Sequence, residues 1–252
     1  MPVDPQPMSR EERMALACDI ADRILTLHPN AIAIGLYGSM ARGTDAPYSD
    51  VEMLCVLDSE GEDYSHEWAY GPGKVEVNFN SENVVLGYAA EIDVDWSLTH
   101  GAFCTVLPLH DPTGFFPKLR DVVLSQPDER FTEVLQHVIV GEIYERIGKL
   151  RNARHTGHRA YLPKLAIDLA TYGAFLIGLA NRHLYTTGAT VLEESVTLPD
   201  APEGYRPLCE QVMAGHLSQP SQIHEDCEAF WAGIIRWAEA KGFRLEQERI
   251  PF

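Results

Sequence analysis

The first half of the chain alternates short apolar runs with turn-forming residues, a pattern that is typical of strands. Apolar runs at Ala31–Leu36 and Met53–Leu57 predict two strands. A Gly-Pro-Gly turn separates Glu67-Trp68 from Lys74–Phe79 and predicts a hairpin of two more strands. The apolar stretch Thr99–Leu109 predicts a further strand before the pattern changes.

Helical spacing of apolar residues precedes these strands and dominates the second half of the chain. Ser9 is followed by acids, which is the signature of a helix N-cap, and the apolar positions after it recur at helical spacing to about His28. Ser81–Glu91 predicts another helix. After about Asp128 the periodicity predicts helices at Phe131–Arg154, Leu162–His183, Thr187–Glu194, Pro207–Gly215 and Ser221–Gly242.

These elements predict an α+β protein with two domains. Residues 1–127 are expected to form a mixed β-sheet domain with flanking helices, and residues 128–252 an α-helical bundle. The boundary is expected in the segment Pro117–Pro127, and no strand is predicted after Leu109. A chain of 252 residues has ample material for these two cores.

The charge of the chain is strongly negative. The formal net charge is −17, whereas nucleic acids are normally bound by basic surfaces, so a nucleic-acid partner is not expected and a polycationic small molecule is favoured. Between Asp45 and His100 there are thirteen Asp or Glu residues and one basic residue, Lys74. A solvated acidic face would explain this segment equally well.

Cysteine usage and hydropathy indicate a cytoplasmic protein with no membrane partner. The five cysteines are scattered and show no C-x-x-C spacing, which favours reduced thiols. The first twelve residues are acidic and lack the apolar region of a signal peptide. The longest apolar stretch, Leu165–Leu179, is interrupted by Asp168 and is not expected to span a bilayer.

The candidate chemistry lies between the first two predicted strands. Gly38-Ser39 follows the first strand, and Asp50 and Glu52 begin the second, where alternation places both carboxylates on one face. Neighbouring carboxylates repel each other unless a cation lies between them, and Mg²⁺ is usually held by one or two carboxylates together with substrate phosphates. Glycine lets backbone N–H groups approach a phosphate closely. Together these residues predict a nucleotidyl-transfer site.

Each of these features is weaker by itself. A Gly-Ser turn is usually only a turn, and an Asp-x-Glu pair on a strand more often faces solvent. On the predicted helix Val134–Arg154, Glu145 and Lys149 are four residues apart, which alone would indicate an ordinary surface ion pair. Only the order and spacing of the Gly-Ser turn and the two acids together favour a catalytic role for these residues over a purely structural one.

Gly38-Ser39 followed by Asp50-x-Glu52, with a third acid at Glu76, resembles the signature of the nucleotidyltransferase superfamily related to DNA polymerase beta. More specifically, the chain is similar to the aminoglycoside 4'-nucleotidyltransferases of the kanamycin nucleotidyltransferase family. The resemblance covers nearly the whole chain and rests on these further stretches: REERM at Arg10–Met14, PYSD-x-EM at Pro47–Met53, SHEW at Ser65–Trp68, VEVNF at Val75–Phe79, LTHG at Leu98–Gly101, GK-x-RN at Gly148–Asn152, LIGL at Leu176–Leu179, YTT at Tyr185–Thr187 and RIPF at Arg249–Phe252.

The resemblance implies a nucleotidyltransferase domain followed by the helical domain, and a transfer of AMP from Mg-ATP to the 4'-hydroxyl of an aminoglycoside. It implies a glutamate base and a lysine that faces the nucleotide at Glu145 and Lys149, which would be catalytic together with Asp50 and Glu52. The expected nucleotide-binding residues are Gly38, Ser39, Arg42, Ser49 and Lys149. The expected Mg²⁺ ligands are Asp50, Glu52 and Glu76, and the expected substrate-binding residues are Glu52, Glu62, Glu67, Glu76, Glu142 and Glu145.

Several points stay open at this stage. Glu76 is assigned both as a metal ligand and as a partner of substrate amines. Gly141 stands where the resemblance leads us to expect an acid in the substrate pocket. The family also implies a homodimer with shared active sites. Two alternatives remain, namely a nucleotidyltransferase of the toxin-antitoxin type that acts on protein or RNA, and a non-catalytic ligand-binding protein.

Overall fold

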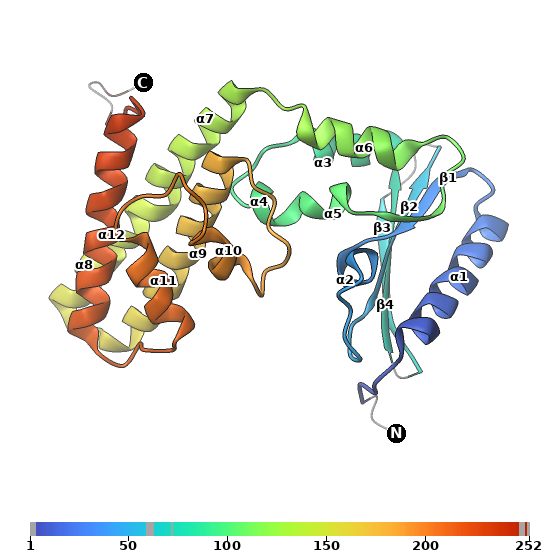
Figure 1. The fold of residues 1–252 in the computed structure, drawn as a ribbon, viewed down its shortest axis with the longest axis horizontal. Helices are drawn as coiled ribbons and strands as arrows, with labels where there is room; N and C mark the ends of the chain where they lie inside the picture. The colour runs from blue at the N-terminus through green and yellow to red at the C-terminus, as the bar shows by residue number, and fades with distance from the viewer. Residues whose placement is uncertain (1–3, 59–62, 72, 247–249, 251–252) are drawn as a thin grey trace. The chain divides into compact units, whose positions relative to one another are not determined.

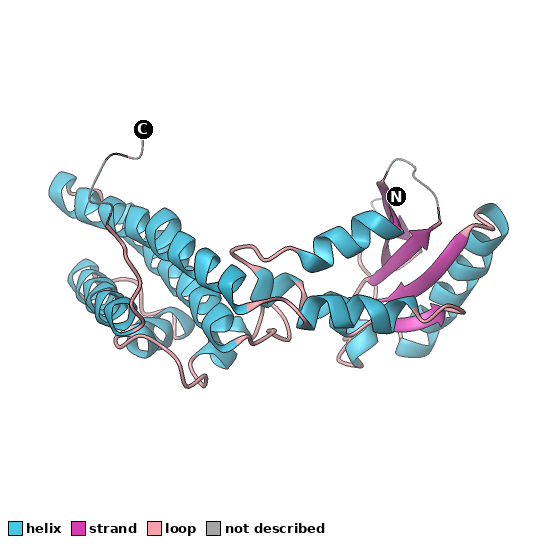
Figure 2. Ribbon diagram, turned by 90° about the horizontal axis from the view of Figure 1, so that it is seen from above, coloured by secondary structure: helices cyan, strands magenta, loops and turns pink. Residues whose placement is uncertain are grey.

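The computed structural model describes residues 4–58, 63–71, 73–246 and 250. The chain divides into two compact units (Figure 1). The first comprises the residues up to Glu91 together with His100–Gln126, and the second comprises Ile92–Thr99 together with the residues from Pro127 onward. The protein is α+β: the first unit holds a mixed sheet, and the second is built from helices (Figure 2).

The first unit is built on a five-stranded sheet in the order β3-β4-β2-β1-β5. Antiparallel pairs join β1 to β2, β1 to β5 and β3 to β4, whereas β2 and β4 run parallel. The predicted hairpin is therefore confirmed as β3 and β4. The strands span β1 Ala31–Leu36, β2 Val51–Leu57, β3 Tyr64–Tyr70, β4 Gly73–Ser81 and β5 Leu107–His110.

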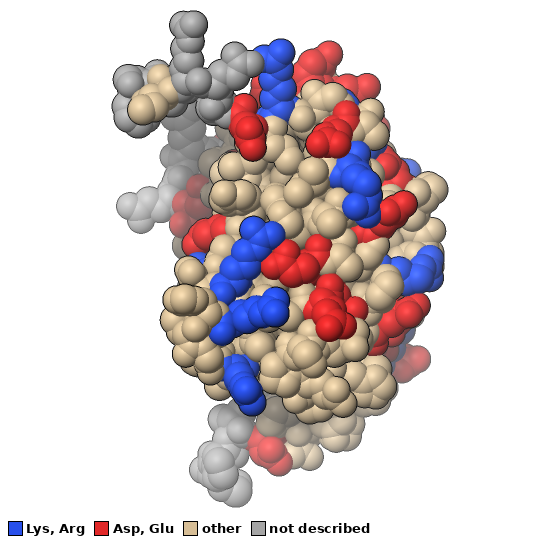
Figure 3. Space-filling model, turned by 90° about the vertical axis from the view of Figure 1, so that its left-hand side faces the viewer, with Lys and Arg blue, Asp and Glu red and all other residues tan. Residues whose placement is uncertain are grey.

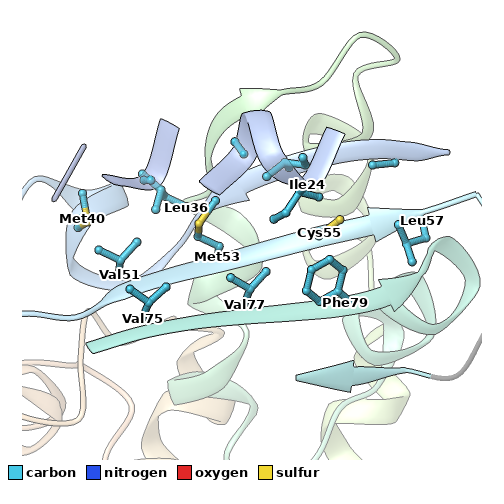
Figure 4. Close-up of a cluster of buried hydrophobic side chains, with 14 residues drawn as sticks. Ile24, Leu36, Met40, Val51, Met53, Cys55, Leu57, Val75, Val77 and Phe79 are labelled. Carbon is cyan, nitrogen blue, oxygen red and sulfur yellow. The ribbon is translucent and has the colours of Figure 1, made fainter. Parts of the chain in front are cut away.

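Helix α1, Arg10–Leu27, covers one face of this sheet. Its N-cap is Ser9, which forms a capping box with Glu12, as the predicted N-cap required. Alternate side chains of β2 and β4 point toward the helix, and Figure 4 shows the cluster that results. Its labelled members are Ile24, Leu36, Met40, Val51, Met53, Cys55, Leu57, Val75, Val77 and Phe79. The intervening residues of β2 and β4, which include Glu52 and Glu76, therefore lie on the opposite face.

The opposite face of the sheet is packed by short helices. Helices α3, Glu82–Ala90, and α6, Phe115–Leu124, contact strands of the sheet and each other. The predicted strand Thr99–Leu109 is wrong over most of its length, because Gly101–Cys104 forms helix α5, which packs on α6, and only Leu107–His110 is a strand. A short apolar run does not distinguish a buried helical turn from a buried strand by periodicity alone.

The second unit is a helical bundle, and no strand follows β5 among the described residues. The predicted helix Phe131–Arg154 is interrupted by seven residues of π-helix. The predicted helix Thr187–Glu194 is shorter and shifted, because the Glu194 carboxylate accepts hydrogen bonds from Thr186 N and Thr190 Oγ1 and holds that segment as a turn. The elements are α4 Trp96–Thr99, α7 Asp128–His137, η1 Val138–Tyr144, α8 Glu145–Thr156, η2 Arg159–Tyr161, α9 Leu162–Asn181, α10 Val191–Ser195, α11 Tyr205–Met213 and α12 Pro220–Ala240.

The α9 helix is the core of this bundle. Together with η2 it forms a 23-residue segment that is long and apolar enough to cross a membrane, but 67% of its most apolar window is buried inside the protein. Its neighbours include α4, whose Trp96 is 2% exposed and meets the Phe131 ring edge to face at 4.8 Å. A Cβ at Gly178 of α9 would lie 2.5 Å from Ser97 Oγ, so this glycine allows the close packing of α4 on α9.

Candidate active site

The turn after β1 is shaped by its contact with an acid of β2. Tyr37 is the N-cap of the short helix α2, Gly38–Arg42, and Gly38 has a φ of +66°. A Cβ on Gly38 would lie 1.8 Å from Glu52 Oε2, so the glycine is required by the carboxylate as well as by the left-handed backbone. The Tyr37 N–H donates to the backbone oxygen of Glu52 at 3.1 Å and fixes the two segments side by side.

Three glutamates form a row across neighbouring strands. Glu52 on β2 pairs with Glu76 on β4, and Glu76 pairs in turn with Glu67 on β3. Residues paired in register present their side chains on the same face, so all three carboxylates lie on the face opposite α1. Like charges opposite each other destabilise a sheet. This carboxylate row therefore favours a positively charged ligand.

Lys74 supplies the positive charge that the structure itself places at this row. Its Nζ lies 2.5 Å from Glu67 Oε1, 3.6 Å from Asp50 Oδ2 and 4.0 Å from Glu76 Oε2. The pKa of Lys74 is raised, chiefly by the hydrogen bond to Glu67. Within the described ranges no group of three or more His, Cys, Asp or Glu side chains is already arranged to hold a metal ion.

The electrostatics of Glu52 show how crowded the negative charge is. Burial raises the pKa of its carboxyl, and the charges of Asp50 and Glu76 raise it further, against a smaller opposing effect of Arg42 and Lys74. Arg42 ends helix α2, and its buried Nε has no hydrogen-bond partner among the residues that the structure describes. A buried guanidinium N–H without an acceptor suits a ligand oxygen.

Glu76 is oriented by two polar neighbours that sequence reasoning missed. Asn78 Nδ2 donates to Glu76 Oε1 at 2.9 Å and to the Tyr37 hydroxyl at 2.7 Å. Burial raises the pKa of Tyr37, and the charges of Glu76 and Glu52 add to this, so its hydroxyl stays protonated. Tyr37 and Asn78 also line a pocket of about 240 Å³ between the sheet and helices α3 and α5. The signal in the sequence was the i, i+2 spacing of Glu76 and Asn78 on one strand.

A second missed feature is a buried ion pair that anchors the loop between α2 and β2. Arg13 on α1 is 2% exposed, and its guanidinium donates to the Asp45 carboxylate, which Arg10 also contacts. Arg13 donates further to the backbone oxygens of Met8 and Pro47. Burial raises the pKa of Asp45, but the hydrogen bonds from Arg13 and Arg10 outweigh it and hold that pKa below its usual range. This cluster fixes the loop that carries Ser49 and Asp50.

The two predicted serines lie near this loop, Ser39 in the helix before it and Ser49 within it. Ser39 is the second residue of α2, directly after Gly38. Ser49 Oγ accepts a hydrogen bond from Ala46 N at 2.9 Å, and its hydroxyl hydrogen remains available to a ligand. Both serines therefore lie in the segment that joins the end of β1 to the start of β2.

Glu145 and Lys149 lie on α8 in the second unit. Lys149 Nζ is 2.6 Å from Glu145 Oε1, and both side chains are about half exposed. The hydrogen bond from Lys149 and its charge lower the pKa of Glu145, and the same pair raises the pKa of Lys149. The two residues therefore form the i, i+4 pair that their spacing indicates, with the carboxylate held ionised and the ammonium charged.

Glu142 lies one turn earlier, in the π-helical segment. It accepts a hydrogen bond of 2.7 Å from Arg146 Nη1, and the Arg146 guanidinium stacks 3.7 Å from the centre of the Tyr172 ring. A Cβ on Gly141 would lie 3.2 Å from the His137 ring. An acid at position 141 would therefore require this histidine to move, and π-helical segments of this kind are frequent at functional sites.

The first unit contains most of the predicted nucleotide and metal residues, namely Gly38, Ser39, Arg42, Ser49, Asp50, Glu52 and Glu76, together with the predicted substrate-binding residue Glu67. Glu142, Glu145 and Lys149 lie in the second unit, Glu142 on η1 and the other two on α8. Glu62 lies outside the described residues.

Comparisons with known proteins cover both units. The nucleotidyltransferase domain family matches residues 17–97, and the KNTase C-terminal domain family matches residues 113–244. Two proteins named aminoglycoside nucleotidyltransferase (4'), from a Bacillus species and from Staphylococcus aureus, are each 45% identical over 247 residues, which cover 97% of this chain and 98% of theirs. A crystal structure of a nucleotidyltransferase-like protein from Exiguobacterium sibiricum matches with a TM-score of 0.54 and 12% identity, over 90% of this chain and 75% of that one, and shows a likeness of fold.

Proposed function

Because the chain belongs to the kanamycin nucleotidyltransferase family, we propose that it transfers AMP from ATP to the 4'-hydroxyl of an aminoglycoside, releases pyrophosphate and so confers resistance. The observation that carries this proposal is the carboxylate row beside Gly38. It lies next to a glycine turn and an arginine whose Nε has no partner among the described residues. The turn and the arginine suit a triphosphate, and the carboxylates suit a polyamine.

The row is suited to substrate amines. The Lys74 ammonium already lies among Asp50, Glu67 and Glu76, and it is the same chemical group as a protonated sugar amine. Glu67 is more exposed than Glu76, with 59% against 27% of the side chain accessible, so an incoming ammonium reaches Glu67 first. In the proposed complex a substrate amine takes over part of the contact that Lys74 makes. Glu62, in the same acidic segment, and Glu142 complete the proposed amine partners.

The acids also fit a divalent cation. Glu52 and Glu76 offer hard oxygen ligands on paired strands, and Asp50 offers another just before β2. Burial raises the pKa of Glu52, the charges of Asp50 and Glu76 raise it further, and a cation would relieve the part that is due to charge. We propose that these three residues hold Mg²⁺ when ATP is bound. A bound Mg²⁺ supplies positive charge that neutralises the triphosphate and its departing half.

The residues of the first unit hold the nucleotide. Arg42, Ser39 and Ser49 donate hydrogen bonds to the β- and γ-phosphates, and the backbone at Gly38 lets these oxygens approach closely. The pair on α8 carries the proton transfer. Glu145 accepts the proton of the 4'-hydroxyl, the sugar oxygen bonds to the α-phosphorus, and the bond from that phosphorus to the bridging oxygen breaks as pyrophosphate leaves. Lys149 stabilises the charge on the α-phosphate oxygens.

Turnover is tested directly by pyrophosphate release. Purified protein with ATP and Mg²⁺ is expected to release pyrophosphate with kanamycin or tobramycin, and none with an aminoglycoside that lacks the 4'-hydroxyl. The Asp50→Asn variant is expected to lose turnover while still binding the drug, which separates an enzyme from a passive ligand-binding protein. Release with the 4'-deoxy drug at the parent rate would contradict the assignment of the 4'-hydroxyl.

We further propose a cytoplasmic homodimer whose active sites draw on both subunits. The resemblance to the family supports the dimer, and five free cysteines support a reducing compartment. A mixing experiment tests the shared site: Asp50→Asn and Glu145→Gln chains, each inactive alone, are combined after mild dissociation. If one active site takes Asp50 from one subunit and Glu145 from the other, mixed dimers contain one intact site and activity returns. Activity that stays absent in verified mixed dimers would contradict the shared site.

A further inference from the structure

A cleft of about 540 Å³ lies in the second unit, where α8 ends and where α9 and α12 begin. Its lining includes Arg154, Arg159, His224 and Glu228. On α8, Arg154 is five residues after Lys149, a rotation of about 140° around the helix axis. The cleft is therefore not an extension of the helix face that carries the proposed base.

His224 gives this cleft an unsatisfied polar atom. The side chain is 6% exposed, and its Nε2 lies 3.2 Å from the backbone oxygen of Leu150. A carbonyl oxygen only accepts, so Nε2 carries a proton. Nδ1 is buried and has no hydrogen-bond partner within the described part of the chain. His224 is one of the residues that line the cleft, and buried polar atoms are normally paired, so an unpaired ring nitrogen on this residue points to a ligand.

The positive groups around the cleft favour an anion. Arg154 and Arg159 are exposed, and neither forms an ion pair within the residues that the structure describes. The 21-residue helix α12 begins at the cleft with Pro220, and the side chain of its N-cap residue Gln219 makes no capping hydrogen bond. Within the described part of the chain the first N–H groups of α12 thus have no cap from this side chain, and together with the positive end of the helix dipole they suit an anion.

The acids at the cleft offset only part of this charge. Glu228 is paired mainly with Arg151, through two hydrogen bonds of 2.9 Å, and interacts less strongly with His224 and Arg154, while Glu225 is exposed. Although the chain has a net charge of −17, five of its 20 Lys and Arg residues lie between residues 146 and 159. Figure 3 shows Lys and Arg side chains in the lower half of the face that it views, with Asp and Glu side chains among them.

We propose that this cleft binds the phosphate group of a small phosphate ester. Arg154, Arg159 and the N-terminus of α12 receive the charged oxygens. His224 Nδ1 pairs with a phosphate oxygen, either by accepting from a P–OH group or, when protonated, by donating. The volume of the cleft is much larger than an inorganic phosphate ion needs, so the organic part of the ester occupies the remainder.

Binding is measured by calorimetry with two probes, inorganic phosphate and glucose 6-phosphate. The titrations use the Arg42→Gln variant, which lacks the proposed phosphate contact of the active site. In that background the Arg154→Gln/Arg159→Gln double change is expected to raise the Kd for glucose 6-phosphate at least tenfold. The matched control is Arg236→Gln, which removes the same charge further along α12 from an exposed pair with Glu203. This control is expected to bind glucose 6-phosphate with the same Kd as the Arg42→Gln protein itself.

A second readout locates the site. Labelled histidine side chains followed by NMR are expected to show a shift of the His224 ring signal on addition of glucose 6-phosphate, and no shift in the double variant. If inorganic phosphate bound as tightly as glucose 6-phosphate, the proposal that the cleft holds the organic part of an ester would be wrong. Absence of binding at millimolar ester, or equal binding by the double variant, would overturn it. When the double change is made alone, with Arg42 intact, pyrophosphate release with ATP and drug is expected to stay unchanged, so failure here is distinct from failure of the proposed function.

Discussion

The missing Cβ at Gly38 leads to a quantitative prediction, because a second glycine offers a matched control. Gly38 and Gly43 both have a left-handed backbone, with φ of +66° and +71°. A Cβ on Gly38 would lie 1.8 Å from Glu52 Oε2, whereas a Cβ on Gly43 would meet no atom within 4 Å. The Gly38→Ala and Gly43→Ala variants therefore share the backbone strain, and only the first displaces the carboxylate.

The two effects differ in size and in readout. Alanine in the left-handed region costs about 1–2 kcal/mol, so both variants are expected to lose roughly that much free energy of unfolding. In a chain of this size, about 1 kcal/mol lowers Tm by roughly 2–4 °C. In Gly38→Ala the Glu52 carboxylate must move by more than 1 Å to reach ordinary contact distance, and a misplacement of about 1 Å costs on the order of 100-fold in rate.

The assay is pyrophosphate release with ATP, Mg²⁺ and kanamycin, together with thermal unfolding of the same preparations. We expect similar losses of Tm in the two variants, and a loss of kcat/KM of about 100-fold in Gly38→Ala alone. If Gly38→Ala kept activity within about threefold of Gly43→Ala, well below the loss that such a misplacement causes, the contact with Glu52 would not be what positions the site.

Three further changes test the remaining contacts. Asp45→Asn leaves a buried arginine without its charged partner, so we expect a loss of about 3–5 kcal/mol in urea unfolding, and a smaller loss would mean that water reaches the arginine. Because the pKa of Asp45 is lowered in the folded state, the stability it contributes is present above the usual carboxyl range and disappears as pH falls through the lowered value; Asp45→Asn is expected to abolish this acid dependence. Asn78→Ala removes the hydrogen bond that orients the Glu76 carboxylate, so kcat/KM is expected to fall about tenfold. An unchanged kcat/KM would contradict a role of Asn78 in orienting Glu76. Lys149→Met removes the partner that lowers the pKa of Glu145, so the acid limb of the pH profile of kcat/KM is expected to move to higher pH; an unmoved limb would exclude Glu145 as the base.

Much of the fold follows from local sequence signals. The capping box at Ser9, the hairpin around the Gly-Pro-Gly turn and the long apolar periodicity of α9 are each determined by residues close together in the chain. The sequence predicts a strand where Gly101–Cys104 forms a helix, because the neighbours of this segment in space decide its conformation and periodicity over four residues carries too little information. The π-helical turn at Val138–Tyr144 has no distinct pattern of its own.

The candidate site was predictable only in part for a similar reason. Alternation placed Glu52 on a defined face of its strand, but its alignment with Glu76 depends on the pairing of β2 with β4, which no local pattern fixes. The role of Asn78 became visible only once that register was known. Arg13 reads as an ordinary helix residue, and its burial against Asp45 is a long-range contact between helix and loop.

The short excursion of the chain at residues 92–99 has a practical consequence for dissecting the protein. These residues contribute Trp96 and Ser97 to the interior of the helical bundle, although they sit between segments of the sheet-bearing unit in the sequence. A cut at a single point near Pro127 therefore yields two incomplete fragments. The N-terminal fragment carries Trp96 without the bundle that buries it, and the C-terminal fragment has a cavity where this indole packs. The two units therefore cannot be exchanged independently by a single crossover. Any chimaera with a relative must transfer this eight-residue segment together with the helical bundle.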